Sequence, residues 1–362
     1  MEAIISNIDK NSWYYRHNSD ISSALIALKD ISKNIVIWGA SQGGLKVLDI
    51  AKRYNLSIKY FVDIDSQKQG KKIEDIEIKS PNVLTKDEFV LIGSMYEKEI
   101  ALSLKQKGIE FLGGLLSLYD FNISNLMTYI KELSKLYDLL YDQDSKNCLT
   151  SIVGYTIDGD ASKLHISPYK QYFHPSVRPT ETDIIVDGGA YDGDTIKDFS
   201  NNLKKITKIY AFEPDKTNFL KLKEFSKTYN NIIPINLALW KETKNLKFNG
   251  NGLTTSSIIN NDNTNSDSYT ISATSIDKFF IENQIEPPTL IKMDIEGAEL
   301  DAILGAKNII TTYKPKLQIC LYHKAEHVYT IPILLKDWVP EYKMFLGHHS
   351  QNWQETILYC CV

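Results

Sequence analysis

Acidic residues and glycines with regular spacing occur at three points of this chain where a buried strand is expected to end. In Asp183–Thr195 (DIIVDGGAYDGDT) an apolar stretch leads into Asp187 and a glycine-rich turn. Glu213 closes the next apolar stretch, KIYAFEPD, and a third, LIKMDIEGAE, contains Asp294 and Glu296. This is the layout of a nucleoside site in a doubly wound sheet: a strand leads through a glycine turn into a helix, and the next strand ends in an acid. In such a site glycine lets the backbone approach the ligand, and the acid accepts the ribose hydroxyls.

The charge of the first turn favours S-adenosylmethionine over a dinucleotide. A dinucleotide site has the pattern G-x-G-x-x-G, which rests a pyrophosphate on a helix N-terminus. Here the turn begins with Asp187 and also contains Asp192 and Asp194. These carboxylates would repel a pyrophosphate but suit a ligand that carries an ammonium and a sulfonium. The alternative is an ordinary strand–turn–helix in which an aspartate only caps the helix.

The expected cofactor contacts follow from the order of the strands. Asp187 and Gly189 should lie beside the methionine part, Glu213 at the ribose hydroxyls, and Ala238 to Trp240 beside the adenine, although Trp240 could instead pack in the core. The complete predicted set is Asp187, Gly189, Tyr191, Gly193, Thr195, Glu213, Pro214, Ala238, Leu239 and Asp294.

A second group of residues is expected to handle the methyl acceptor. Methyl transfer from a sulfonium to an oxygen is an in-line displacement that needs alignment and removal of the acceptor's proton. His323 follows the fifth strand and titrates near neutral pH, so we predict it as the catalytic base. Asp294 and Glu296 are predicted to orient the acceptor. Three alternatives remain open. Asp294 and Glu296 could bind a divalent cation, His323 could be purely structural, and Glu296 could only favour the N-terminus of the following helix. No metal site is assigned, since magnesium rarely selects histidine.

From about Asp142 onward the chain resembles the FkbM family of S-adenosylmethionine-dependent methyltransferases. The resemblance rests on seven blocks in the family's order: VDGGAYDGDT, AFEPD, NLALW, IKMDIEGAEL, PKLQICLYHKAEH, IPILLKDWVPEYKMFLGHHS and ETILYCCV. It implies O-methylation of a hydroxyl on a sugar, a glycan precursor or a related metabolite, either free or linked to a nucleotide.

The composition indicates neither a nucleic-acid interface nor membrane insertion. The chain has 362 residues and a net charge of −4, with acids and bases well mixed, so no basic surface is expected. No apolar run approaches the ~20 residues that span a bilayer, and the N-terminus lacks a signal-peptide pattern. The cysteines form no CxxC pair and fit a reducing compartment. We therefore expect a cytoplasmic enzyme, and a homo-oligomer remains open.

Two nucleotide-fold units in tandem are expected to position these residues, which makes the fold class α/β. We predict a Rossmann-like domain at residues 1–120, a connecting helix and lid region at 121–182, and a class I methyltransferase domain at 183–362. The last should contain a seven-stranded, mostly parallel sheet. In the lid region, Gln171–Phe173 should contact the ligand or pack on the core.

The first unit contains the strand and glycine turn NIVIWGASQGG, and Asp63 ends its next strand. It could bind a nucleotide or nucleotide-sugar, or serve only docking or dimerisation. Two further functions also stay open. An NAD-dependent sugar oxidoreductase would use this unit, but no Tyr-x-x-x-Lys pair follows a strand and the second unit would be idle. A non-catalytic nucleotide-binding scaffold would not need acids at three strand ends.

Overall fold

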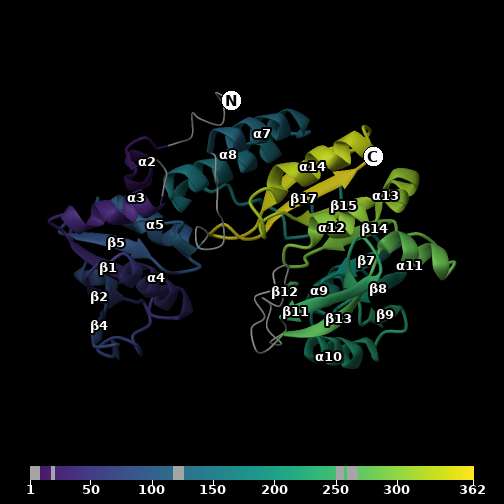
Figure 1. The fold of residues 1–362 in the computed structure, drawn as a ribbon, viewed down its shortest axis with the longest axis horizontal. Helices are drawn as coiled ribbons and strands as arrows, with labels where there is room; N and C mark the ends of the chain where they lie inside the picture. Colours follow the sequence, from purple (N-terminus) through teal and green to yellow (C-terminus); the bar gives the residue numbers. More distant parts are fainter. Residues whose placement is uncertain (1–8, 18–20, 117–125, 250–256, 259–267) are drawn as a thin grey trace. The chain divides into compact units, whose positions relative to one another are not determined.

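The computed structural model describes residues 9–17, 21–116, 126–249, 257–258 and 268–362. The chain divides into two compact units, whose elements are labelled in Figure 1. Unit 1 comprises residues 1–137, 143–167 and 348–354, and unit 2 comprises residues 138–142, 168–347 and 355–362. None of the described helices combines the length and the apolar character that crossing a membrane requires.

Unit 1 is built on a six-stranded sheet with the order β3-β4-β2-β1-β5-β6. Its strands are β1 (Asn34–Trp38), β2 (Ile58–Val62), β3 (Lys72–Ile73), β4 (Ile76–Lys79), β5 (Glu88–Ile92) and β6 (Glu110–Leu112). The pairings of β1, β2, β4, β5 and β6 are parallel, whereas β3 pairs antiparallel with β4. This confirms the parallel sheet predicted for the first nucleotide-fold unit.

Alternating side chains explain how the helices of unit 1 cover both faces of this sheet. Successive residues of a strand point to opposite faces. Ile35 and Ile37 of β1 therefore pack with α4 (Gln42–Arg53), whereas Val36 and Trp38 pack with α5 (Glu97–Lys107). The remaining helices of the unit are α2 (Trp13–Arg16), α3 (Ile21–Ala27), α8 (Gln143–Asp158), most of α7 (Leu126–Leu139), and the short 3-10 turns Leu28–Asp30, Pro81–Val83 and Ala161–Lys163.

The unit boundaries differ from the boundaries predicted at residues 120 and 182. Helix α8 lies within residues 121–182, which were predicted to connect the two domains, but it belongs to unit 1, where the Tyr155 hydroxyl donates to Glu97 Oε2 at 2.6 Å. The segment 348–354 also belongs to unit 1, since Asn352 Nδ2 donates to Met95 O at 3.0 Å. Unit 1 is therefore assembled from three separate chain segments, because its buried contacts reach residues far beyond position 120.

Unit 2 contains a seven-stranded sheet with the order β16-β17-β15-β14-β7-β8-β9. Its strands are β7 (Ile184–Gly188), β8 (Lys208–Phe212), β9 (Ile232–Ile235), β14 (Leu290–Met293), β15 (Lys316–Cys320), β16 (Lys343–His348) and β17 (Thr356–Cys361). Strands β15, β14, β7, β8 and β9 are parallel, and β17 is antiparallel to β15. The predicted mostly parallel seven-stranded sheet is thus confirmed. Chain order reverses between β14 and β7, so the carboxyl ends of these strands flank the crevice where such sheets bind ligands.

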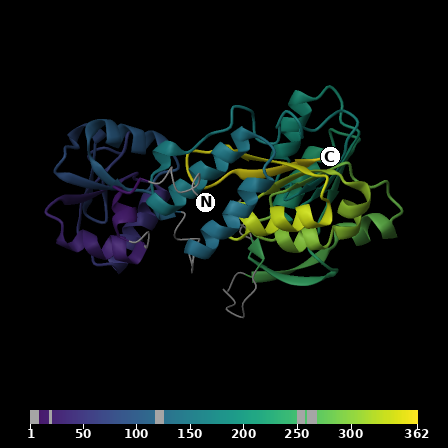
Figure 2. The same ribbon diagram turned by 90° about the horizontal axis from the view of Figure 1, so that it is seen from above.

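Helices cover both faces of this sheet. On one face, Phe199 of α9 (Asp194–Asn202) and Leu222 of α10 (Lys216–Ser226) pack with strand residues such as Ile185 and Ile209. The helices coloured green to yellow in Figure 2 lie together along the other side. They are α11 (Ile276–Glu282), α12 (Glu299–Leu304), α13 (Lys307–Tyr313) and α14 (His327–Trp338).

A small second sheet in unit 2 was not predicted. Its order is β10-β13-β11-β12, with strands β10 (Ala238–Leu239), β11 (Lys244–Asn249), β12 (Ser257–Ile258) and β13 (Ser268–Thr274). Strand β13 alternates polar residues with Tyr269, Ile271 and Ala273, which pack together with Trp240 on one face. The other side chains of β13 are polar, so this strand has a weaker apolar pattern than the strands of the large sheet.

Candidate active site

The glycine turn after β7 lies directly against the end of β14. Gly189 has a φ of 72°, and a Cβ at this position would lie 1.8 Å from the carbonyl oxygen of Asp294. The backbone N–H groups of Gly189 and Ala190 both donate to Phe212 O, at 3.1 and 3.0 Å. Only glycine allows this approach. The ends of β7, β8 and β14 are therefore held together at one edge, which brings together the acids singled out in the sequence.

Glu213 directly follows β8, and its carboxylate accepts two described hydrogen bonds. Its Oε2 accepts from Tyr191 N at 2.9 Å and its Oε1 accepts from Asp215 N at 2.8 Å. Burial raises the pKa of this carboxyl to about 7, although both hydrogen bonds oppose the shift. A carboxylate accepts about four hydrogen bonds, so Glu213 keeps the capacity to accept from two hydroxyls, as predicted for a ribose.

The partner of Asp187 is a lysine that the sequence analysis missed. Lys292 of β14 lies opposite Asp187 in the parallel register with β7, and its Nζ is 2.9 Å from Asp187 Oδ1. The same ammonium donates to Gly189 O at 3.0 Å. Burial raises the pKa of Asp187 to about 6 against the opposing effect of Lys292. Burial would lower the pKa of Lys292, but the Asp187 and Asp294 carboxylates raise it above its ordinary value.

This ion pair changes the role expected for Asp187. We predict that its carboxylate lies beside the methionine part of the cofactor. The side chain of Asp187 is fully buried and its charge is already compensated by Lys292. A charged lysine inside the apolar run LIKM was the signal in the sequence, because a buried ammonium needs a counter-charge on a neighbouring strand.

Asp294 accepts hydrogen bonds from two tyrosines that come from different elements. Its Oδ1 accepts from the Tyr322 hydroxyl and its Oδ2 from the Tyr172 hydroxyl, both at 3.1 Å. Gln318 of β15 holds the segment that carries Tyr172, since its Nε2 donates to Tyr172 O at 2.8 Å and to Val177 O at 2.9 Å.

The predicted lid residues are therefore divided between two roles. Tyr172 joins the carboxylate cluster, and Gln171 Nε2 donates to Glu355 Oε2. The ring of Phe173 instead packs on Phe199, with ring centroids 5.9 Å apart. The alternative of core packing holds for both rings, since Tyr172 is buried in the same core with its ring centroid 6.4 Å from that of Phe199, and Tyr172 has the contact with Asp294 in addition.

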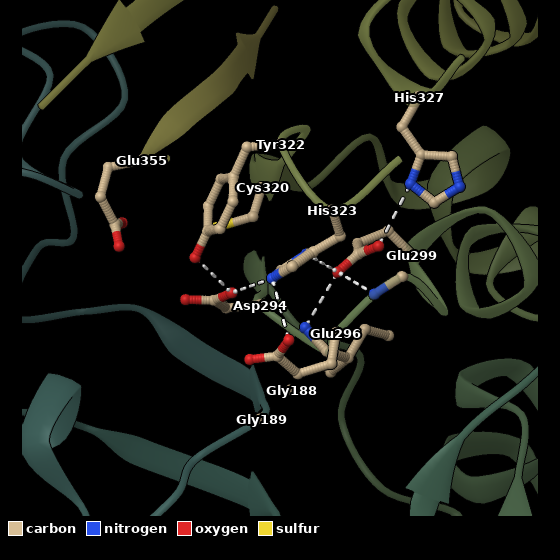
Figure 3. Close-up of polar contacts among 12 residues, drawn as sticks. Gly188, Gly189, Asp294, Glu296, Glu299, Cys320, Tyr322, His323, His327 and Glu355 are labelled. Carbon is tan, nitrogen blue, oxygen red and sulfur yellow. Dashed lines mark hydrogen bonds and ion pairs between the residues drawn. The ribbon is translucent and has the colours of Figure 1, made fainter. Parts of the chain in front are cut away.

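Glu299 holds two histidines beside the same strand ends (Figure 3). Its Oε1 lies 2.8 Å from His323 Nδ1 and its Oε2 lies 3.2 Å from His327 Nδ1. Oε1 also accepts from the backbone N–H of Ile295 at 3.0 Å and of Gly297 at 3.3 Å. Burial would raise the pKa of Glu299, but the two histidines and these hydrogen bonds hold it well below its ordinary value. In the sequence Glu299 shows only as a residue in the first turn of α12, so its contacts with two histidines could not be predicted.

His323 is held as an imidazolium, which does not agree with the base predicted from the sequence. Burial would lower its pKa, but Glu299, Asp294 and Glu296 raise it to about 10. A group that is protonated at neutral pH cannot accept a proton there. Its Nε2 lies 3.4 Å from Asp294 Oδ1 and 3.6 Å from Glu296 Oε2, and no hydrogen-bond partner is described for it. His323 is therefore suited to donate a hydrogen bond to a bound acceptor.

We expect the stability of unit 2 to fall as the pH rises from about 6.5 to about 10. His323 binds its proton more tightly in the folded chain, where its pKa is about 10, than at the ordinary value of 6.5. Its stabilising contribution is fully present below the ordinary pKa and is lost as the pH rises through the folded value. Thermal unfolding at a series of pH values measures this slope. His323→Gln should flatten it, and an unchanged slope in that variant would contradict the assignment.

Backbone strain is concentrated around the same strand ends. Nine non-glycine residues of the described chain have positive φ, and four of them surround this site: Tyr172 at 66°, Tyr191 at 48°, Glu296 at 54° and Glu355 at 62°. Each such conformation costs on the order of 1–3 kcal/mol and persists at functional sites where the surroundings enforce it. The fold thus sets the direction of these side chains at the expense of stability.

The remaining predicted cofactor residues lie at the rim of this cluster or within the packing. Gly193 and Thr195 begin α9, and a Cβ on Gly193 would lie 2.6 Å from the Phe225 ring. Pro214 follows Glu213, and its carbonyl oxygen accepts from Asn236 Nδ2 at 3.2 Å. Ala238 and Leu239 are buried in β10. No described contact joins these five residues to Asp294 or His323, so their cofactor roles remain predictions.

A further histidine, His348, ends β16. His348 is fully buried among the residues of unit 1, where burial lowers its pKa to about 3. Throughout the described ranges, no group of three or more His, Cys, Asp or Glu side chains is arranged to hold a metal ion.

In unit 1, Asp63 accepts two backbone hydrogen bonds as Glu213 does in unit 2, but a lysine also contacts its carboxylate. Asp63 Oδ2 accepts from Ala40 N at 2.8 Å and its Oδ1 accepts from Asp65 N at 2.9 Å. Lys68 Nζ lies 3.1 Å from the same carboxylate and donates to Ser41 Oγ at 2.7 Å. A nucleotide hydroxyl would therefore have to compete with Lys68, and nucleotide binding by this unit stays a prediction.

Comparison with known proteins gives matches in both parts of the chain. Residues 187–343 match the methyltransferase FkbM domain, and residues 31–111 match the family described as C2185-like, N-terminal. No curated protein matches the chain.

Among solved structures, the chain is similar to the methyltransferase FkbM from Methylobacillus flagellatus KT. The identity is 22% and the TM-score is 0.73, over 93% of this chain and 92% of that one. A fibrillarin/Nop5p complex matches at 16% identity and a TM-score of 0.34, over 52% of this chain and 76% of that chain. Fibrillarin from Aeropyrum pernix, solved with natively bound S-adenosyl-L-methionine, matches at 13% identity and a TM-score of 0.31, over 50% of this chain and 67% of that chain.

The matched domain and the shared fold agree with the geometry of unit 2. Unit 2 also contains the sheet edge where Gly189 of the glycine turn lies against Asp294. We conclude that residues 187–343 form a methyltransferase domain of the FkbM family.

Proposed function

We propose that this methyltransferase uses S-adenosylmethionine and methylates a hydroxyl of a sugar, a glycan precursor or a related metabolite, free or linked to a nucleotide. The observation that carries the cofactor assignment is the free accepting capacity of Glu213 beside the glycine turn. The resemblance of the sequence blocks to the FkbM family supports the oxygen and sugar assignments. We further propose a cytoplasmic location, which the free cysteines of the described chain support.

The residues at the sheet edge fit such a cofactor chemically. Glu213 would accept from its ribose hydroxyls, and Gly189 allows the backbone to lie close to it. The surplus of carboxylates favours a ligand with positive charge over one with a pyrophosphate. When bound, the cofactor supplies an electrophilic methyl group on a sulfonium.

The acceptor side is defined by Asp294, Glu296 and His323. Asp294 is fixed by two tyrosine hydroxyls and can orient an acceptor hydroxyl. Glu296 has a side chain that is one-third exposed. Burial raises its pKa to about 7, and His323 opposes the shift. His323 would donate through Nε2, which keeps the acceptor oxygen in place.

Calorimetry with S-adenosylhomocysteine tests the cofactor assignment. Binding to the full chain should weaken about 10- to 100-fold in Glu213→Ala, because hydrogen bonds to a charged group are lost. Glu224→Ala serves as the control, since its side chain is 73% exposed on α10. Binding of NAD without binding of S-adenosylhomocysteine would overturn the proposal. Mass spectrometry of a panel of sugars and nucleotide-sugars, incubated with S-adenosylmethionine and the protein, tests the acceptor class.

A further inference from the structure

Glu355 is the one acid of this cluster that has neither a cation nor backbone donors among the described residues. Its carboxylate accepts a single described hydrogen bond, from the neutral amide of Gln171. It stands just before β17, with a φ of 62°. Nothing in the sequence around Glu355 indicates a role for it.

The other acids of the cluster are each compensated. Asp187 is paired with Lys292, and Glu299 with His323 and His327. Asp294 and Glu296 both lie within 4 Å of His323 Nε2, at 3.4 and 3.6 Å. Glu213 has two backbone N–H donors. A partly buried carboxylate without such compensation gains most from binding a proton.

Several charged and titratable groups face Glu355 from the strands packed against it. Figure 3 shows its carboxylate on the same side of the cluster as Asp294 and the Tyr322 hydroxyl. Electrostatic interactions link the pKa of Glu355 to those of its neighbours, which are Asp294, Lys292, Glu296, His323, Tyr172, Tyr322 and Cys320. Glu355 therefore faces the position where Asp294 would orient an acceptor.

We propose that Glu355 takes the proton from the acceptor hydroxyl during methyl transfer, and that Gln171 positions its carboxylate. This inference rests on the proposed function. Glu355 gains one proton, and the acceptor oxygen, having lost it, carries the methyl group. The electron pair of the broken carbon–sulfur bond stays on sulfur, which becomes a neutral thioether. The positive charge of the sulfonium is balanced by the proton that Glu355 gains, so no further reactant is needed.

The arrangement sets the direction of the pH dependence. Burial and the Asp294 carboxylate raise the pKa of Glu355 to about 7, while Gln171, His323 and Lys292 oppose the shift. Only the ionised carboxylate can accept a proton, so turnover should rise with pH through about 7. The Gln171 amide stabilises the ionised form, so Gln171→Leu should move this rise to higher pH.

Glu355→Gln in the full chain tests the proposal. The variant keeps the side-chain shape, so S-adenosylhomocysteine should bind as in the wild type by calorimetry. Turnover of S-adenosylmethionine with the acceptor found in the sugar panel should fall about 10²–10⁴-fold, the usual contribution of a general base. The residual activity should lack the rise near pH 7. Infrared spectra without ligand should also show one carboxyl fewer that ionises near pH 7, the remaining signal there including that of Glu213 and Glu296.

Glu326→Gln is the matched control, because Glu326 is an exposed residue just before α14 that lies outside the cluster. Near-full turnover in Glu355→Gln would overturn the inference. So would a large loss that keeps the rise near pH 7, since Glu355 would then only orient the acceptor. If Glu355→Gln fails to fold, an unmoved pH profile in Gln171→Leu overturns it equally. Failure of the proposed function is distinguishable, because neither the wild type nor the control would bind S-adenosylhomocysteine.

Discussion

Replacing Lys292 by methionine is expected to lower the free energy of unfolding of unit 2 by about 3–5 kcal/mol. Lys292 and Asp187 are both buried, at 1% and 0% exposure of their side chains. Methionine fills similar space but leaves the Asp187 carboxylate without a counter-charge in the core. The loss also removes the ammonium that binds the carbonyl oxygens of Gly188 and Gly189. Binding of S-adenosylhomocysteine should therefore weaken together with stability.

Thermal unfolding measures this effect, because 3–5 kcal/mol corresponds to a shift of roughly 6–20 °C for a unit of this size. Lys227→Met is the matched control, since its side chain is 65% exposed at the end of α10, and it should change stability by less than about 0.5 kcal/mol. Adding Asp187→Asn to Lys292→Met should recover much of the loss, because no charge then stays buried. Equal stability of Lys292→Met and the control would show that the ion pair is not structural.

Replacing Glu299 by glutamine should have the second largest effect, a loss on the order of 3 kcal/mol in unit 2. Glutamine can still accept from the backbone N–H groups of Ile295 and Gly297, so the substitution removes mainly the charge between His323 and His327. The pKa of His323 should then fall toward its ordinary value. The imidazolium that faces Asp294 and Glu296 would be lost at neutral pH.

Two measurements check this second prediction. Nuclear magnetic resonance titration of His323 should show a pKa several pH units lower in Glu299→Gln than in the wild type. Thermal unfolding should lose most of the slope between pH 6.5 and 10 that is expected from His323. Glu326→Gln should change neither quantity. A histidine titration that stays near pH 10 would mean that Asp294 and Glu296 alone hold the charge.

The large sheet of unit 2 could be predicted from the sequence because its strands are apolar and the parallel ones near the site lead into a glycine or an acid. The sequence was also sufficient to place Glu213 and Asp294 at one edge, since parallel strands share their carboxyl ends. The role of His323 could not be predicted in the same way. Its pKa depends on Glu299, which comes from a different element and shows only as a helix residue in the sequence.

Glu355 gave even less signal than Glu299. It lies in a polar stretch before the last strand, and nothing in that stretch distinguishes it from an exposed loop residue. Only the antiparallel pairing of β17 with β15 brings it to the strand that carries Cys320 and leads into Tyr322. Lys292, in contrast, could have been found, because a charged residue inside an apolar strand requires a partner across the sheet.

Because segment 348–354 belongs to unit 1, the folding of unit 1 depends on residues that the ribosome adds long after the rest of the unit. Ribosomal synthesis proceeds from the N-terminus, and domains generally fold as they emerge. Unit 1 cannot form its contacts from Gln351 and Asn352 to Lys98 and Met95 until residue 352 has been translated, about 250 residues after Lys98. A nascent chain stalled before residue 348 should therefore expose this part of unit 1 to proteases and chaperones.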